Sequence, residues 1–173
     1  MSEISPAAVE AIKMAIQLEK DGRAFFEEAA QKTENQLGKK MFERLAKDEI
    51  DHLKTFQKIF DAVTEGGDWK ELTQKTPRVG RVPVFEKKEG EEKREVNPGE
   101  LDALRKAMNI EKDAIEFFQK ATEEAEDPLE KKIFSTIQKE EEFHYDMLQA
   151  QYDSLSHSGM WYDIGEFQMD GMY

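Results

Sequence analysis

Residues 11–29 read AIKMAIQLEKDGRAFFEEA, and residues 103–121, which lie 92 positions later, read ALRKAMNIEKDAIEFFQKA. The same shift places KKMFERLAKDEIDH, residues 39–52, on KKIFSTIQKEEEFH, residues 131–144, without a gap. In total, 16 of the 42 positions from Ala11 to His52 are identical to their counterparts. The chain therefore contains a duplicated unit, and a unit that packs on its own copy generates an approximate two-fold axis.

Each copy contains two helical stretches, because apolar residues recur in it at spacings of three and four. Ser5 followed by Pro6 is a helix start, and Asp127 followed by Pro128 separates the last two helices. We expect a turn at residues 35–38 inside the first copy and helix ends at Gly66 and Gly67. The expected helices span residues 6–33, 39–63, 98–126 and 129–155.

The two helical hairpins are joined by a connector of about residues 65–98, where prolines, glycines and a charged run interrupt every periodicity. Within it we expect residues 78–85 to form at most a short extended edge segment. Two short loops and one long crossover are typical of ferritin-like bundles. We therefore predict an all-α, ferritin-like four-helix bundle over residues 1–157, followed by an aromatic and acidic tail over residues 158–173. We expect the tail to pack on the bundle or on another subunit.

Composition excludes several classes of function. The chain has no cysteine, so disulfides, thiol nucleophiles and thiolate metal sites are excluded. Its formal net charge of -13 and lack of a basic patch argue against nucleic acid and against anionic lipid as partners. An 18-residue apolar run is absent, and the first 20 residues lack the pattern of a secretory signal. We therefore expect a cytoplasmic protein.

The apolar stripe of every predicted helix is interrupted by ionisable residues near its middle. Burying an ionised carboxylate without a partner costs on the order of several kcal/mol. The neighbouring lysines fall outside the stripes, so metal cations are the simplest compensation, and two divalent ions would balance four carboxylates. We predict that two metal ions are bound by Glu19, Glu49, His52, Glu111, Glu141 and His144.

Carboxylates with imidazoles and no thiolate favour iron or manganese over copper. Iron is our first choice, and manganese stays open. Asp48 and Glu140 directly precede two of the predicted ligands, and we expect them to accept the spare ring N–H of a histidine across the bundle. A single Glu-x-x-His is usually an exposed salt bridge, so the alternative is that the helix faces are wrongly assigned. Two such motifs that coincide with two further glutamates favour the metal site.

Together with the repeated hairpin, Glu19, Glu49-Ile-Asp-His52, Glu111 and Glu141-Glu-Phe-His144 resemble the rubrerythrin branch of the ferritin-like superfamily. The resemblance implies a non-haem di-iron centre in which Glu49 and Glu141 bridge the irons and the other four residues are terminal ligands. It also implies reduction of hydrogen peroxide, or of O2, in protection against oxidative stress. Members of this branch are usually homodimers or higher homo-oligomers.

The sequence departs from the rubrerythrin pattern in three ways. Without cysteine it has no rubredoxin-like domain, so its electrons are expected from a separate rubredoxin-type donor protein. Ala114 stands where the family carries an extra glutamate that exchanges with a histidine when the iron changes oxidation state. Phe26 and Phe118 stand where tyrosines often hydrogen-bond the metal carboxylates, so proton delivery is expected to differ.

The leading prediction is thus a di-iron peroxidase or related oxidase. An iron-handling, ferroxidase-like protein without sustained turnover is the second reading, which Ala114 favours slightly. A di-manganese catalase-like enzyme is the third, and a purely structural bundle is the least favoured. His157 has no counterpart in the repeat and is expected to be an exposed polar residue beyond the last helix.

Overall fold

The computed structural model describes residues 5–65 and 97–162, and α-helices form nearly all of this part of the chain. The expected segment at 78–85 and the last eleven residues of the tail lie outside the described residues. The four helices are α1 (Pro6–Lys32), α2 (Gln36–Thr64), α4 (Pro98–Glu124) and α5 (Pro128–Ser158). The predicted all-α fold is confirmed.

A capping side chain begins each helix. Ser5 caps α1, where its Oγ accepts a hydrogen bond of 3.0 Å from the backbone N–H of Ala8. Asn97 and Asp127 cap α4 and α5 in the same way. A proline follows all three caps, because its fixed φ suits the first helical position and its missing N–H is not needed there.

Helix α2 begins three residues earlier than the sequence predicted. The side chain of Asn35 accepts hydrogen bonds from the backbone N–H groups of Leu37, at 2.9 Å, and Gly38, at 3.3 Å. A capped first turn is stable even though it contains a glycine. Gly38 is therefore helical and not part of the turn.

Helix α5 is also longer than predicted and ends at Ser158, where it is capped by Gly159, whose φ of 69° is left-handed. Such a glycine closes a helix without steric cost. His157 accordingly lies in the last turn of α5, although it is exposed as expected. Its Nδ1–H donates to the backbone oxygen of Asp153 at 2.7 Å, which is a local helix-end contact.

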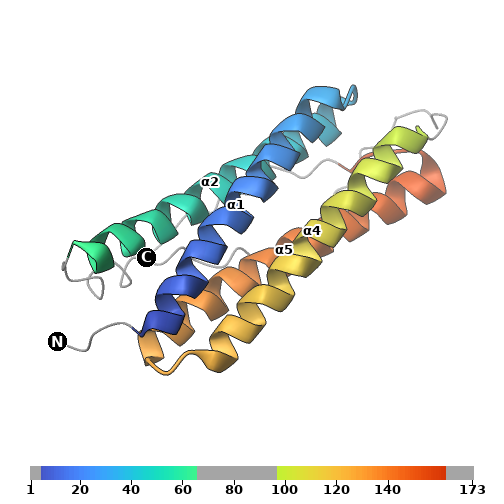
Figure 1. Cartoon of the computed structure of the whole chain (residues 1–173). Helices are drawn as coiled ribbons and strands as arrows, with labels where there is room; N and C mark the ends of the chain where they lie inside the picture. The colour runs from blue at the N-terminus through green and yellow to red at the C-terminus, as the bar shows by residue number, and fades with distance from the viewer. Residues whose placement is uncertain (1–4, 66–96, 163–173) are drawn as a thin grey trace, which may run out of the picture.

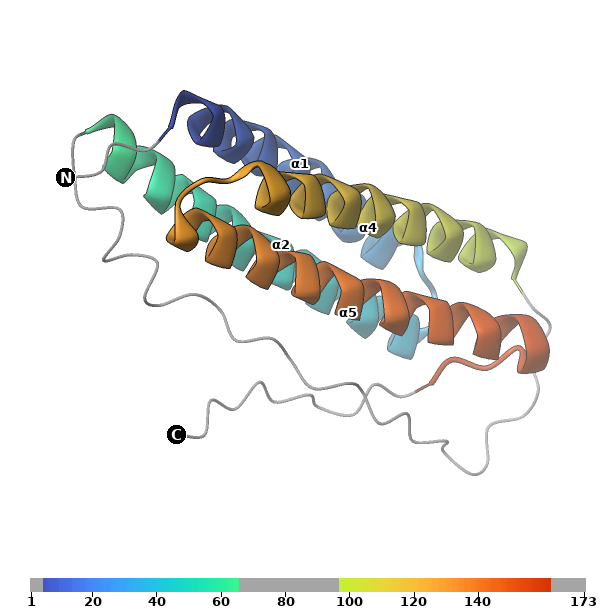
Figure 2. The same ribbon diagram turned by 90° about the horizontal axis from the view of Figure 1, so that it is seen from below.

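The helices form two antiparallel hairpins that pack side by side. Helix α1 packs along α2, α4 packs along α5, and α1 also contacts α4 (Figure 1). Helices α2 and α5 face each other on the other side of the bundle (Figure 2). Because α2 ends and α4 begins at opposite ends of the bundle, the expected crossover connectivity of a ferritin-like fold is confirmed.

The core has two aromatic clusters, one on each side of the middle of the bundle. The rings of Phe26 and Phe42 lie 6.4 Å apart with an interplanar angle of 22°. Their repeat counterparts, Phe118 and Phe134, also lie 6.4 Å apart, at 28°. The similar ring geometry in the two copies indicates that the sequence repeat is also a structural repeat.

Trp161, just beyond α5, is 4% exposed and closes one end of the bundle. Its ring lies 6.3 Å from that of Phe42, and its Nε1–H donates to Glu100 Oε2 at 3.3 Å. Trp161 also comes within 2.8 Å of the place where a Cβ on Gly38 would stand, so residue 38 has room for no side chain. The expected packing of the tail on the bundle is confirmed for Trp161.

Candidate metal centre

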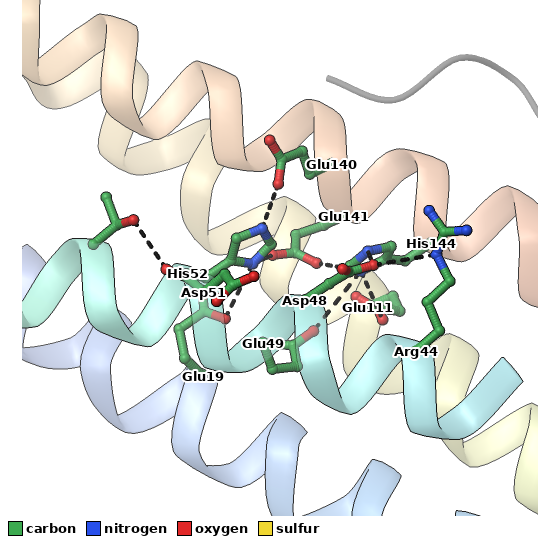
Figure 3. Close-up of polar contacts among 11 residues, drawn as sticks. Glu19, Arg44, Asp48, Glu49, Asp51, His52, Glu111, Glu140, Glu141 and His144 are labelled. Atoms are coloured by element: carbon green, nitrogen blue, oxygen red, sulfur yellow. Dashed lines mark hydrogen bonds and ion pairs between the residues drawn. The ribbon is translucent and has the colours of Figure 1, made fainter. Parts of the chain in front are cut away.

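The middle of each helix contributes ionisable side chains to one buried layer between the two aromatic clusters (Figure 3). None of the six residues that the sequence predicted as ligands is more than 3% exposed. The predicted helix faces are therefore correct, and the alternative of exposed salt bridges is wrong. The layer contains all six predicted residues, namely Glu19, Glu49, His52, Glu111, Glu141 and His144.

The six residues form two overlapping groups that can each hold a metal ion. One group is Glu19, Glu49, His52 and Glu141, and the other is Glu49, Glu111, Glu141 and His144. Within each group the possible ligand atoms all lie within 4.8 Å of one another. Glu49 and Glu141 belong to both groups. Each hairpin thus provides one carboxylate that is shared and one that is not.

Both histidines turn Nδ1 toward the carboxylates. His52 Nδ1 lies 3.1 Å from Glu141 Oε1 and 3.4 Å from Glu19 Oε2. His144 Nδ1 lies 3.0 Å from Glu141 Oε2 and 3.5 Å from Glu111 Oε1. Glu141 therefore lies between the two imidazoles, whose ring centroids are 6.0 Å apart.

The other ring nitrogen of each histidine meets a carboxylate from the opposite hairpin. His52 Nε2 lies 2.5 Å from Glu140 Oε2, and His144 Nε2 lies 3.4 Å from Asp48 Oδ2. The hydrogen bond expected across the bundle is thus confirmed for Glu140, and Asp48 lies at ion-pair distance from the other histidine. These contacts fix the ring orientation that leaves Nδ1 free to bind a metal ion.

Sequence reasoning missed Arg44, whose Nε lies 3.7 Å from Asp48 Oδ2. Arg44 and Asp48 stand four residues apart on α2, a spacing that typically forms ion pairs on a helix. That spacing could have identified the contact. Arg44 thus places a positive charge next to Asp48. Glu140, the corresponding partner of His52, has one buried oxygen without a hydrogen-bond partner among the described residues.

Several buried polar atoms of the centre have no hydrogen-bond partner in the described part of the chain. They are both carboxylate oxygens of Glu19, Oε1 of Glu111, Oε1 of Glu141 and Nδ1 of His52. Each unsatisfied buried polar group costs about 1–3 kcal/mol, and more if it is charged. Metal ions would satisfy all of these atoms at once, so the residues present fit such ions.

The two shared carboxyl groups, Glu49 and Glu141, have pKa values that are shifted in opposite directions. Burial and the nearby Glu141 raise the pKa of Glu49 well above its usual range. The same two causes raise the pKa of Glu111 to about 8. Burial alone would raise the pKa of Glu141 as well, but contact with His52 and His144 outweighs it and lowers this pKa.

The histidines respond in the opposite direction. Burial alone would lower the pKa of His52, but Glu141 and Glu19 outweigh burial and raise it well above the usual value. The pKa of His144 is raised against burial by Glu111 and Asp48. The carboxylates around the two imidazoles thus favour the protonated form of the rings when no metal is bound. Divalent cations would replace those protons.

Four carboxylates and two imidazoles in two overlapping groups, at the centre of a crossover bundle, define the di-metal carboxylate class of ferritin-like proteins. The family model described as Rubrerythrin matches residues 10–152. The chain belongs to the rubrerythrin family, a ferritin-like di-iron family. No curated protein and no solved structure matches it. None of the helices in residues 5–65 and 97–162 has the length and apolar character of a membrane span.

Proposed function

We propose that this protein is a di-iron oxidoreductase that reduces hydrogen peroxide, or O2, with electrons from a separate rubredoxin-type protein. The observation that carries the proposal is the sharing of Glu49 and Glu141 between two metal-binding groups whose buried atoms otherwise lack partners. Membership of the rubrerythrin family supports the same reading. Hard carboxylate oxygens with imidazole nitrogen support iron as the metal.

We expect each of the two groups to bind one metal ion. Glu19 and His52 would hold one iron, Glu111 and His144 would hold the other, and Glu49 and Glu141 would contact both. When bound, the two ferrous ions supply the two electrons that, with two protons, convert one hydrogen peroxide molecule into two water molecules.

The surrounding side chains would support this chemistry by keeping the centre dry and rigid. Phe26 and Phe118, each fully buried, close the layer toward the two aromatic clusters. Glu140 and Asp48 would hold the rings of His52 and His144 in the orientation that binds metal. Since Phe26 and Phe118 carry no hydroxyl group, protons would have to come from other groups.

Anaerobic loading of the metal-free protein with Fe(II), followed by stoichiometric peroxide and then reduced rubredoxin, tests the proposal. We expect rapid formation of a ferric absorbance spectrum and its loss on reduction, through many cycles. Iron that is oxidised once and then released or stored would favour the iron-handling alternative, which Ala114 supports by removing the family's exchangeable glutamate. Oxygen evolution from peroxide by the manganese-loaded protein, without a donor, would favour a catalase-like enzyme.

Replacing Glu140 with alanine should weaken the binding of the ion next to His52. The His52 ring would lose its hydrogen-bond partner at Nε2, and loss of such an orienting partner typically costs about 10–100-fold in metal affinity. Anaerobic equilibrium titration with Fe(II) would measure the change, with Asp146→Ala on the exposed side of α5 as the control. Equal affinity in Glu140→Ala and the control would show that Glu140 does not orient the ligand.

A further inference from the structure

We propose that Gly22 is a positioning residue that gives Glu49 room to move toward α1, which makes the two shared carboxylates functionally different. This inference rests on the proposed metal-binding function. It concerns a residue that is not itself a ligand and that has no polar side chain.

Glu49 closely approaches the backbone of α1 at Gly22. A Cβ on Gly22 would stand 3.2 Å from Glu49 Oε2, 3.4 Å from its Cδ and 3.8 Å from its Cγ. All three of the nearest atoms thus belong to one side chain. An alanine at this position would have to displace the Glu49 carboxylate by a few tenths of an ångström.

No other feature of α1 requires glycine at position 22. Gly22 lies in the middle of a 27-residue helix, and the positive-φ glycine of the described chain is Gly159. A glycine inside a helix costs about 0.5–1 kcal/mol relative to alanine. The space that Gly22 leaves for Glu49 is therefore the feature that explains it.

In the sequence repeat, Ala114 is the counterpart of Gly22, and Glu141 is the counterpart of Glu49. Glu141 lies between the imidazoles, 3.1 Å from His52 Nδ1 and 3.0 Å from His144 Nδ1. Glu49 Oε1 is farther away, at 3.8 Å from His144 Nδ1. The shared carboxylate opposite glycine is thus drawn toward α1, whereas its counterpart is held at the centre.

A carboxylate shared by two metal ions would need space beside it to change position when the charge of the ions changes. Gly22 provides that space next to Glu49, and the two histidines hold Glu141 from both sides. Glu49 is therefore the shared ligand that we expect to shift, and Glu141 is the one that we expect to stay.

The test compares Gly22→Ala with the matched variant Ala114→Gly in the full metal-free chain. Both proteins are titrated anaerobically with Co(II), whose visible absorbance reports its coordination, and their thermal unfolding is measured without metal. For Gly22→Ala we expect unfolding at or above the wild-type temperature, since alanine favours the helix. We also expect a changed Co(II) spectrum and a second ion bound about 10-fold more weakly.

For Ala114→Gly we expect the reverse, a lower unfolding temperature with wild-type Co(II) binding. A wild-type spectrum and affinity in Gly22→Ala would overturn the inference. Failure of metal-free Gly22→Ala to fold would overturn it too, because Glu49 could then not yield to a methyl group. Fewer than one Co(II) per wild-type chain would instead refute the proposed metal site itself.

Discussion

Replacing Glu141 with alanine should remove high-affinity binding of both metal ions at once. This carboxylate belongs to both groups and lies within 3.1 Å of the Nδ1 atoms of both histidines. Its loss would take one ligand from each ion. Since loss of a partner that only orients a ligand already costs about 10–100-fold in affinity, the loss of a shared ligand should exceed this for each ion.

Equilibrium dialysis against Fe(II) or Co(II), with metal counted per chain, would measure the effect of Glu141→Ala. The matched control is Glu142→Ala, which changes the next residue of α5, an exposed glutamate. We expect the control to bind like the wild type. A Glu141→Ala protein that still binds two ions tightly would mean that Glu141 is not a ligand.

Replacing Trp161 with alanine should cause a large loss in the free energy of unfolding of the metal-free protein. Truncation of a fully packed tryptophan costs about 3–5 kcal/mol through lost burial and the cavity that remains. The indole contacts Phe42 and lies directly beside Gly38. Because Gly38 has no side chain, it cannot fill the cavity that loss of the indole would leave. For a domain of this size, each kcal/mol lowers the melting temperature by about 2–4 °C.

Thermal unfolding followed by circular dichroism, with a chelator present, would measure this loss. Tyr162→Ala is the matched control, because the neighbouring side chain is only half-buried and its hydrogen bonds with Gln151 use backbone atoms that remain. We expect a clearly smaller decrease in the control. Equal melting temperatures for the Trp161→Ala protein and the wild type would show that Trp161 does not stabilise the bundle.

The fold could be predicted because the same pattern of two amphipathic helices occurs twice in the sequence. Local chemistry marked Ser5 and Pro6 as the start of a helix and placed a helix boundary at Asp127 and Pro128. The start of α2 was placed too late because glycine at position 38 suggests a turn. A side chain at position 38 would collide with Thr33 and with the indole of Trp161, and the latter lies more than 120 positions away in the sequence.

The six residues of the centre could be predicted because ionisable groups in apolar helix stripes have few explanations. Asp48 and Glu140 followed from the need of each histidine for a second partner, and the structure places them there. Gly22 could not be assigned a role in this way, since its effect depends on how closely α1 approaches Glu49. The sequence shows that Gly22 and Ala114 differ between the two copies. The effect of this difference on Glu49 can be inferred only from how the helices pack.

Anaerobic titration of the wild-type, metal-free protein with Fe(II) tests the central claim most directly. Two ions per chain, with binding lost when Glu49 or Glu141 is changed to alanine, is the result that the shared-carboxylate centre predicts. Fewer than one ion per chain, unaffected by either change, would contradict it.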